Sequence, residues 1–181
     1  MAYRFSTPQA GLPPMTDHVV PTTVETVGST AVSTVLVPLG TRMRAVDPTY
    51  GEGEFIRLVG VASTVVGALV IYNATTYQTA LITVSNGKNK GGPVAVAMAA
   101  CVANEHGWYQ IGGLAVIKKT TVAVTPQVPI FISATAGRIK VLASAGQQIL
   151  GALTANLTTI VTTTSTVVVC IDRPHCQGQV T

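Results

Sequence analysis

The chain has 181 residues, of which 48% are hydrophobic and 10% are charged, and its formal net charge is +4. This length and hydrophobic content suffice for one domain with an appendage, and they exclude disorder of the main body. The charged fraction is far below the roughly 25% of an average soluble domain, so the surface is poorly protected against association. The composition therefore favours a chain that works within an assembly.

The first 37 residues are predicted to form an extended arm. Four prolines between positions 8 and 21 lie among Thr, Ser and Gly, and proline fixes φ and removes a backbone donor. Residues 31–37 have strand propensity, and two interpretations stand: pairing with the edge of a neighbouring chain, or an ordinary first strand of the same domain. The chain starts without the apolar stretch of a signal peptide, and no run approaches the roughly 20 apolar residues of a membrane span, so we expect no membrane partner.

Residues 38–173 are predicted to be an all-β body. Short runs rich in Val, Ile, Thr and Ala end at turn residues, which is typical of a small antiparallel β-barrel or β-sandwich, jelly-roll-like in architecture. No helix longer than about two turns is expected, and residues 174–181 form a C-terminal tail. The predicted strands are 39–48, 54–61, 68–73, 79–85, 93–100, 108–111, 114–120, 129–134, 138–142, 148–153 and 166–172.

Two of these strands have an informative alternation. In 39–48, Met43 and Ala45 share the face opposite Arg42 and Arg44, as in a half-buried strand. In 93–100, alanines occupy one face and Val or Met the other. An alanine face admits close approach of another layer, which is either an oligomer contact or the centre of a tight sandwich.

His106 is the one histidine inside the body, and it follows Glu105 and lies five residues after Cys101. A nucleophile and base of the Cys/His kind need a rigid supporting shell. Such neighbours are common in loops, so we interpret this segment as a turn that leads into the next strand.

Glu52 and Glu54 alternate onto one face and resemble a glycosidase carboxylate pair, but neighbouring carboxylates usually line a strand edge. His175 and Cys176 form a metal pair without third and fourth ligands. The Gly-rich segment 87–92 lacks the Walker pattern and is interpreted as a loop tip. We therefore predict no catalytic, cofactor-binding or metal-binding residues, and no enzyme activity.

The chain has three cysteines, and an odd number cannot all be joined in disulfide bonds. Cys101 follows an apolar strand and is expected to be a small buried residue. Cys170 and Cys176 would meet after oxidation if Pro174 turns the chain between them, and this pairing stays open. The basic residues are spread over several segments without interleaved aromatics, so no nucleic-acid partner is expected.

Several segments together resemble the capsid decoration (cement) proteins of tailed bacteriophages. The resemblance runs from about residue 38 to 173, and the ordered series of small-residue β segments carries it. The segments are Pro38-Leu-Gly-Thr41, Asp47-Pro-Thr-Tyr-Gly-Glu-Gly-Glu-Phe-Ile56, Gly60-Val-Ala-Ser-Thr64, residues 93–100, Gly107-Trp-Tyr-Gln-Ile-Gly-Gly113, Ser133-Ala-Thr-Ala-Gly-Arg-Ile139 and Gly146-Gln-Gln-Ile-Leu-Gly-Ala152.

The resemblance implies a non-enzymatic virion protein, assembled in the host cytoplasm, that binds the outer surface of the capsid. Its partners would be the major capsid protein and itself, as a dimer or trimer, and it implies no catalytic residues. A head-fibre or receptor-binding module is the alternative, although the chain has neither a periodic shaft nor coiled-coil heptads.

Overall fold

The computed structural model describes residues 3–5, 15, 23–27, 30–34 and 37–179, and it confirms the all-β prediction. Within this part of the chain the single helix has four residues, and no helix is long and apolar enough to cross a membrane. The elements are β1 (Arg4–Phe5), β2 (Thr23–Val27), β3 (Thr30–Thr34), β4 (Arg42–Asp47), β5 (Gly51–Val59), β6 (Leu69–Tyr72), β7 (Thr79–Leu81), α1 (Val84–Gly87), β8 (Val94–Ala97), β9 (His106–Lys118), β10 (Pro129–Ile132), β11 (Ile139–Lys140), β12 (Gln148–Thr154) and β13 (Thr166–Cys176).

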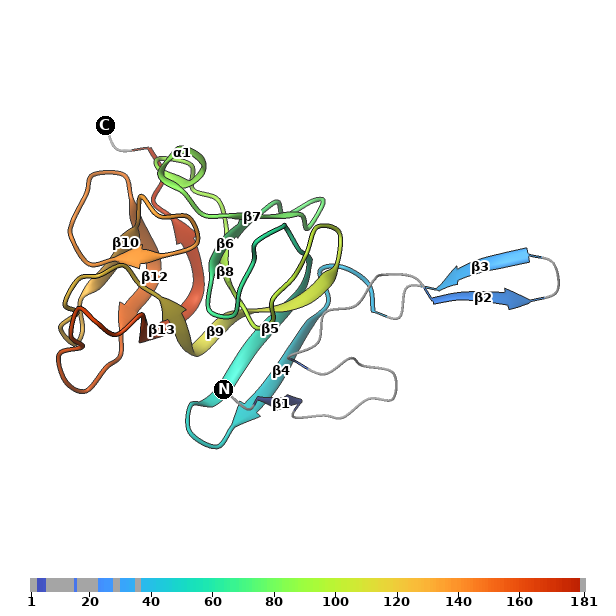
Figure 1. The fold of residues 1–181 in the computed structure, drawn as a ribbon, viewed down its shortest axis with the longest axis horizontal. Helices are drawn as coiled ribbons and strands as arrows, with labels where there is room; N and C mark the ends of the chain where they lie inside the picture. Colours follow the sequence, from blue (N-terminus) through green and yellow to red (C-terminus); the bar gives the residue numbers. More distant parts are fainter. Residues whose placement is uncertain (1–2, 6–14, 16–22, 28–29, 35–36, 180–181) are drawn as a thin grey trace.

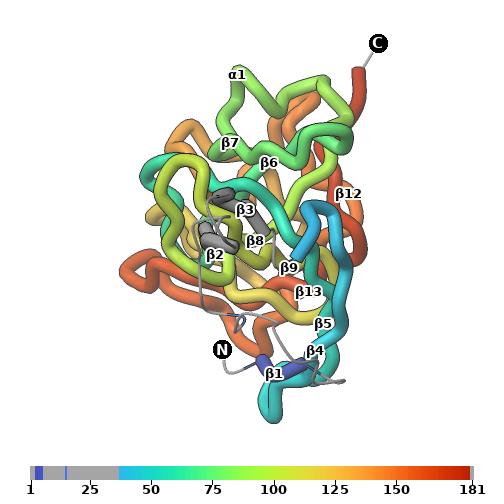
Figure 2. The backbone as a smooth tube through the Cα atoms, turned by 90° about the vertical axis from the view of Figure 1, so that its right-hand side faces the viewer, coloured from blue at the N-terminus to red at the C-terminus, as the bar shows by residue number. Residues whose placement is uncertain are grey.

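Eleven strands belong to one antiparallel sheet, with the order β1-β4-β5-β9-β13-β12-β10-β11 and with β8, β6 and β7 branching from β9. The sheet folds over itself without closing into a barrel, so the architecture is that of a sandwich (Figure 1). The second view shows α1 and β1 at opposite ends of the body (Figure 2).

Strand β9 organises the sheet because it changes partner along its length. Its first half pairs with β5 on one edge, while the other edge pairs first with β8 and then with β13. The change occurs at Gly112 and Gly113, where Gly113 has a φ of +89° and a Cβ would collide with the Glu52 carbonyl oxygen. We predicted two strands, 108–111 and 114–120, because the glycine pair resembles a turn; cross-strand pairing on both edges carries one strand through it.

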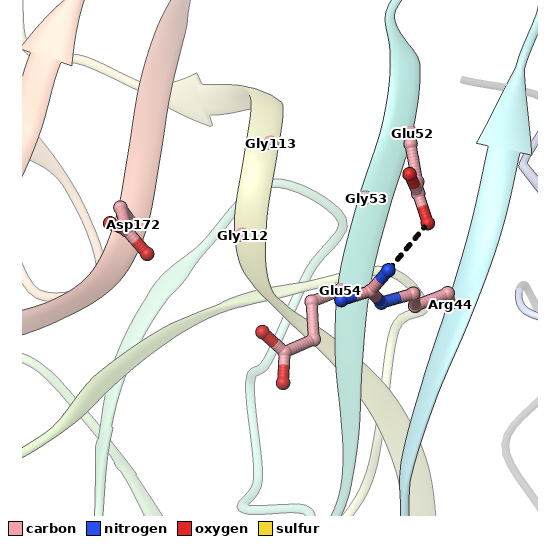
Figure 3. Close-up of a pocket in the computed structure, with 7 residues that line it drawn as sticks. All are labelled: Arg44, Glu52, Gly53, Glu54, Gly112, Gly113 and Asp172. Carbon is pink, nitrogen blue, oxygen red and sulfur yellow. Dashed lines mark hydrogen bonds and ion pairs between the residues drawn. The ribbon is translucent and has the colours of Figure 1, made fainter.

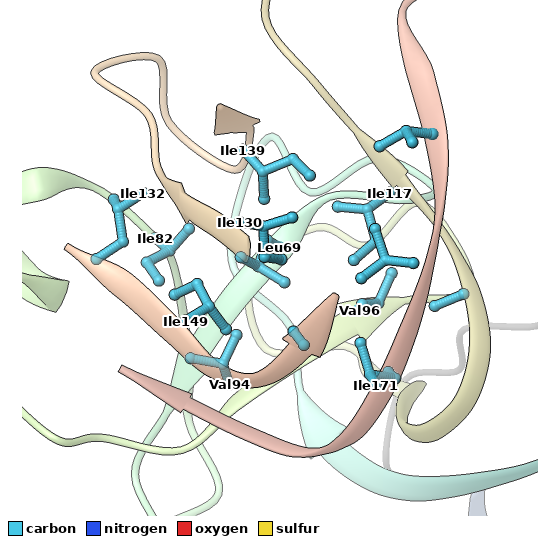
Figure 4. Packing of buried hydrophobic residues seen from close by; sticks show 14 of the residues in the cluster. Leu69, Ile82, Val94, Val96, Ile117, Ile130, Ile132, Ile139, Ile149 and Ile171 are labelled. Carbon is cyan, nitrogen blue, oxygen red and sulfur yellow. The ribbon is translucent and has the colours of Figure 1, made fainter. Parts of the chain in front are cut away.

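The largest hydrophobic cluster lies between the folded-over parts of the sheet. Ile130 and Ile149 from β10 and β12 face Leu69, Val94 and Val96 from β6 and β8 across this core (Figure 4). A second cluster on the other side of β8 contains Ala95 and Ala97, which are fully buried within the chain. The alanine face is therefore the tight centre of the sandwich and not an oligomer contact.

Residues 3–5 and Met15 pack against the body, unlike the extended arm that we predicted over residues 1–37. Strand β1 pairs with β4, and Tyr3 and Met15 join a third cluster that contains Phe55 and Trp108. Tyr3 contacts Phe55 edge-on at 4.9 Å between ring centroids. The prolines of this segment led to the prediction of an unpacked arm. The burial of the Tyr3 ring was not predicted because it depends on the surface that the ring meets and not on the ring's own segment.

Within the segment 31–37, residues 31–34 belong to β3, which is not a strand of the body's sheet; pairing with the edge of a neighbouring chain stays a prediction. Strand β3 pairs with β2 in a separate two-stranded sheet, with Val27 opposite Thr30. The two residues between them are Gly and Ser, a signature of tight hairpins. The predicted alternation of β4 is confirmed, since Ala45 is buried and Arg42 and Arg44 are exposed.

Two further boundaries differ from the predictions. The end of the predicted strand 79–85 is α1 instead, because Thr83 and Asn86 form a capping box that starts a helical turn. Strand β13 continues through Pro174 to Cys176, into the predicted tail, and Arg173 has a φ of +42°. Cys170 and Cys176 consequently lie on one strand, opposite Leu153 and Ile149 of β12, and both are free thiols. The proposed turn between them is wrong.

Candidate functional site

A shallow depression of about 240 Å³ lies where β9 changes partner, and it gathers most of the acidic residues of the sheet (Figure 3). Glu52 and Glu54 come from β5 and Asp172 from β13, on either side of Gly112 and Gly113. The depression exists because two consecutive glycines leave the sheet without side chains at this point.

Arginines pair with the carboxylates of this depression. The Arg44 NH1 atom lies 3.5 Å from Glu52 Oε1, and the Arg173 Nε atom lies 3.5 Å from Glu54 Oε2. Both arginines are largely exposed, so each pair contributes at most about 1 kcal/mol. The predicted pair Glu52 and Glu54 is thus brought into one hollow, but each residue has its own cationic partner.

His106 lies at the start of β9 and is buried. Burial, and next the positive charge of Arg57, lower the pKa of the imidazole below its usual value. The Glu105 Oε2 atom accepts a hydrogen bond from the Val102 backbone N–H at 3.0 Å. Burial also raises the pKa of the Cys101 thiol, which disfavours a nucleophilic thiolate.

The remaining chemistry-bearing residues are dispersed. His175 is exposed on β13, whereas Cys176 is buried and its pKa is raised to about 11 by burial. No group of three or more His, Cys, Asp or Glu residues suited to a metal ion occurs in the part of the chain that the structure describes.

Two cations, Arg57 and Lys119, are buried, and neither was predicted to be. Lys119 donates hydrogen bonds from Nζ to the carbonyl oxygens of Thr120, Val122 and Val161, at 3.3, 2.8 and 3.1 Å. Arg57 lies over the Trp108 ring at 5.5 Å from its centroid, and its Nε and NH1 atoms have no hydrogen-bond partner among the residues that the structure describes. Burial lowers the pKa of both side chains.

Exposed hydrophobic residues form the more distinctive feature of the surface. Val65, Val66 and Val102 are 44%, 52% and 59% exposed, and we call them the loop patch. Their two loops are joined by backbone hydrogen bonds, among them Cys101 N–H to the Thr64 carbonyl oxygen at 3.2 Å. The loop patch is therefore held in a defined shape by the backbone beneath it.

The second apolar surface is the outer side of three neighbouring strands, which we call the sheet face. The inward residues of these strands belong to the largest core cluster, so the alternate residues point outward. Cys170 is exposed at its centre and Leu153 is half exposed beside it. The residues of the sheet face are Leu114, Val116, Leu150, Leu153, Val168 and Cys170.

Comparison with known proteins identifies no neighbour. No family model matches the chain, and neither a curated protein nor a solved structure matches it. The function must therefore be argued from the surfaces themselves.

Sequence reasoning missed both apolar surfaces. Val65, Val66 and Val102 lie in loops, where isolated valines carry no pattern. The residues of the sheet face resemble ordinary strand residues, because alternation identifies two faces of a strand and does not say which one a second layer covers. Asp172 is likewise brought to Glu54 only by the pairing of β5 and β13 with β9.

Proposed function

We propose that this chain is a decoration protein of a tailed-bacteriophage capsid, which binds the outside of the head and stabilises contacts between major capsid subunits. The ordered β segments that resemble this family all lie in the body of the fold. The observation that carries the proposal is the loop patch, an exposed apolar surface on a rigid all-β body with few charges.

The loop patch suits a protein partner for a physical reason. Large exposed hydrophobic side chains grouped on one surface gain free energy when another protein covers them. The loops are already ordered by backbone hydrogen bonds between Gly60 and Glu105 and between Thr64 and Cys101. Little conformational entropy is then lost on binding.

Stabilisation of the capsid follows from linkage. A ligand that binds the assembled shell and not its separated subunits shifts the equilibrium toward assembly. Many weak contacts over one shell act together, because subunits linked in an assembly bind at high effective concentration. No covalent step and no cofactor enter this mechanism.

The test is co-sedimentation of the purified protein with heads of the phage that carries its gene. The double variant Val66→Asp/Val102→Asp should lose binding at least tenfold. Val46→Asp is the matched control, because Val46 is 47% exposed on β4, away from the loop patch. Equal binding by both variants would remove the loop patch from the proposal.

Electron microscopy of the same particles tests the wider claim. Density spread over the shell is expected. Density confined to vertices or to the tail would favour a head-fibre or receptor-binding module instead, and absence of the protein from virions would overturn the proposal.

A further inference from the structure

The sheet face carries opposite charges at its two ends. Lys118 lies opposite Thr166 at one end, and Asp172 lies opposite Gly112 at the other. Residues 166 and 172 are about 20 Å apart along an extended strand. Among the described residues, Lys118 and Asp172 form no ion pair, whereas Arg44 pairs with Glu52 and Arg173 with Glu54 nearby.

The shape of the sheet face is also asymmetric along the strands. Leu157 is 96% exposed and follows β12 on the side toward Thr166, because Ala155 already pairs with Val168. At the opposite end, toward Asp172, is an apolar hollow of about 390 Å³, separate from a larger hollow of about 680 Å³ that Leu157 itself lines. It is lined by Gln148, Ile149, Leu150, Gly151, Ala152, Leu153, Cys170 and Asp172.

Both asymmetries are complementary to the same surface turned end for end. In this arrangement a second copy faces the first, and a two-fold axis lies between the two sheet faces. The axis runs across the strands and passes over Val169, which is midway between residues 166 and 172. Lys118 of each copy then lies near Asp172 of the other. The same rotation places each Leu157 over the other copy's hollow.

We propose that the sheet face binds a second copy of this chain in a symmetric, face-to-face dimer. The occupant is a second copy because the same two-fold rotation brings Lys118 near Asp172 and Leu157 over the hollow. An isologous interface requires this kind of self-complementarity. Burial of the apolar centre drives association, and the two Lys118 to Asp172 pairs set its orientation. The dimer does not depend on capsid binding.

A charge exchange tests the orientation. Sedimentation equilibrium should give a dimer for the native chain at micromolar concentration. Lys118→Glu and Asp172→Lys should each weaken the dimer tenfold or more, because like charges then meet across the interface. The double variant should restore dimerisation to within about threefold of the native chain.

Lys90→Glu is the matched control, since Lys90 is an exposed lysine in the loop after α1. It should leave the dimer unchanged. A native chain that stays monomeric at 100 µM would overturn the proposal, and so would a double variant that dimerises no better than either single variant. Circular dichroism of each variant separates loss of association from loss of folding.

Cys170 provides an independent probe, because Cys101 and Cys176 are buried and Cys170 is exposed. With sheets about 10 Å apart and Cys170 one residue from the axis, the two Cys170 Cα atoms are about 12 Å apart. A short bis-maleimide should therefore yield a covalent dimer, which Cys170→Ser abolishes and Leu157→Asp reduces at least fivefold. Equal cross-linking in the Leu157→Asp variant would contradict the placement of Leu157 in the hollow.

Discussion

Lys119 and Arg57 are both almost fully buried cations, yet the two regions around them satisfy the charge differently. Lys119 directs Nζ at three backbone carbonyl oxygens and joins residues 120–122 to residue 161. Arg57 instead lies on the Trp108 ring, beneath the cluster that Tyr3 and Met15 complete, with Nε and NH1 unpaired.

The difference shows that a buried charge can affect the stability of the fold in different ways, depending on its hydrogen-bond partners. A buried ammonium that saturates its donors with carbonyl groups holds loops together. A buried guanidinium with unpaired donors has lost its hydration, and only its contact with the Trp108 ring offsets that loss. We therefore expect Lys119 to stabilise the fold and Arg57 to contribute little.

The largest effect is expected for Lys119→Met. Methionine fills a similar volume but removes three charge-assisted hydrogen bonds to partly buried carbonyl oxygens, at roughly 1 kcal/mol or more each. The carbonyl oxygens of Thr120 and Val161 keep a backbone donor, and that of Val122 loses its donor. The free energy of unfolding should fall by about 3 to 4 kcal/mol, measured by urea denaturation. Lys90→Met, a change at an exposed lysine in the loop after α1, is the control and should cost less than about 1 kcal/mol.

Tyr3→Ala tests the cover over the Arg57 region. It removes a buried ring and two hydrogen bonds of its hydroxyl, to the Leu114 carbonyl oxygen at 2.7 Å and from Gln110 Nε2 at 3.2 Å. We expect a loss of about 3 kcal/mol on chemical denaturation. Tyr3→Phe keeps the ring and should lose about 1 kcal/mol, and an equal loss in both variants would mean that packing of the ring contributes nothing.

Arg57→Met is the direct counterpart of Lys119→Met. It removes an incompletely satisfied charge and a ring contact, and these effects oppose each other. The free energy of unfolding should change by less than about 1 kcal/mol. A loss as large as that of Lys119→Met would show that the two cations are equivalent, contrary to the comparison.

The smallest expected effect is the pH dependence of the free energy of unfolding that His106, next to Arg57, contributes. Because its pKa is lowered in the folded state, the unfolded chain binds more protons below about pH 6.5. Stability should therefore fall as pH decreases through this range, by no more than about 1.4 kcal/mol per pH unit, and level off below the folded pKa.

His106→Asn should remove this part of the pH dependence in denaturation between pH 8 and 5. Arg57→Met should reduce it, since one cause of the lowered pKa is then absent. A wild-type profile that matches the His106→Asn profile would contradict the assignment.

The strands that sequence predicted well are those with strong alternation and clear turns. Strand β4 has its predicted faces, and the runs that became β6, β10 and β12 lie within two residues of their predicted bounds. Two failures lie at residues that resemble strand ends. Gly112 and Gly113 resemble a turn, but Gly112 is paired on both edges, with Glu54 and Asp172, and β9 continues through it. Pro174 resembles a break, but β13 passes it at an irregularity and pairs with β12 again at His175. Local propensity is a weak guide where both edges of a strand are paired.

The candidate surfaces were less predictable than the fold. Glu52 and Glu54 were foreseen as neighbours because two residues along a strand share a face. The positions of Asp172, the loop patch and the sheet face depend on contacts between distant segments. In several of these contacts the two residues are 50 or more positions apart, as for Glu54 with Gly112 and Gly112 with Asp172.

The sequence by itself determined the all-β class, the low surface charge and most strand positions, because composition and period-two alternation act locally. Only the tertiary structure decided which face of each strand is covered, that Tyr3 and Met15 belong to the core, and that Lys119 and Arg57 are buried. The reason is that burial depends on which distant segments meet, and free energy is gained from that meeting and not from either segment alone.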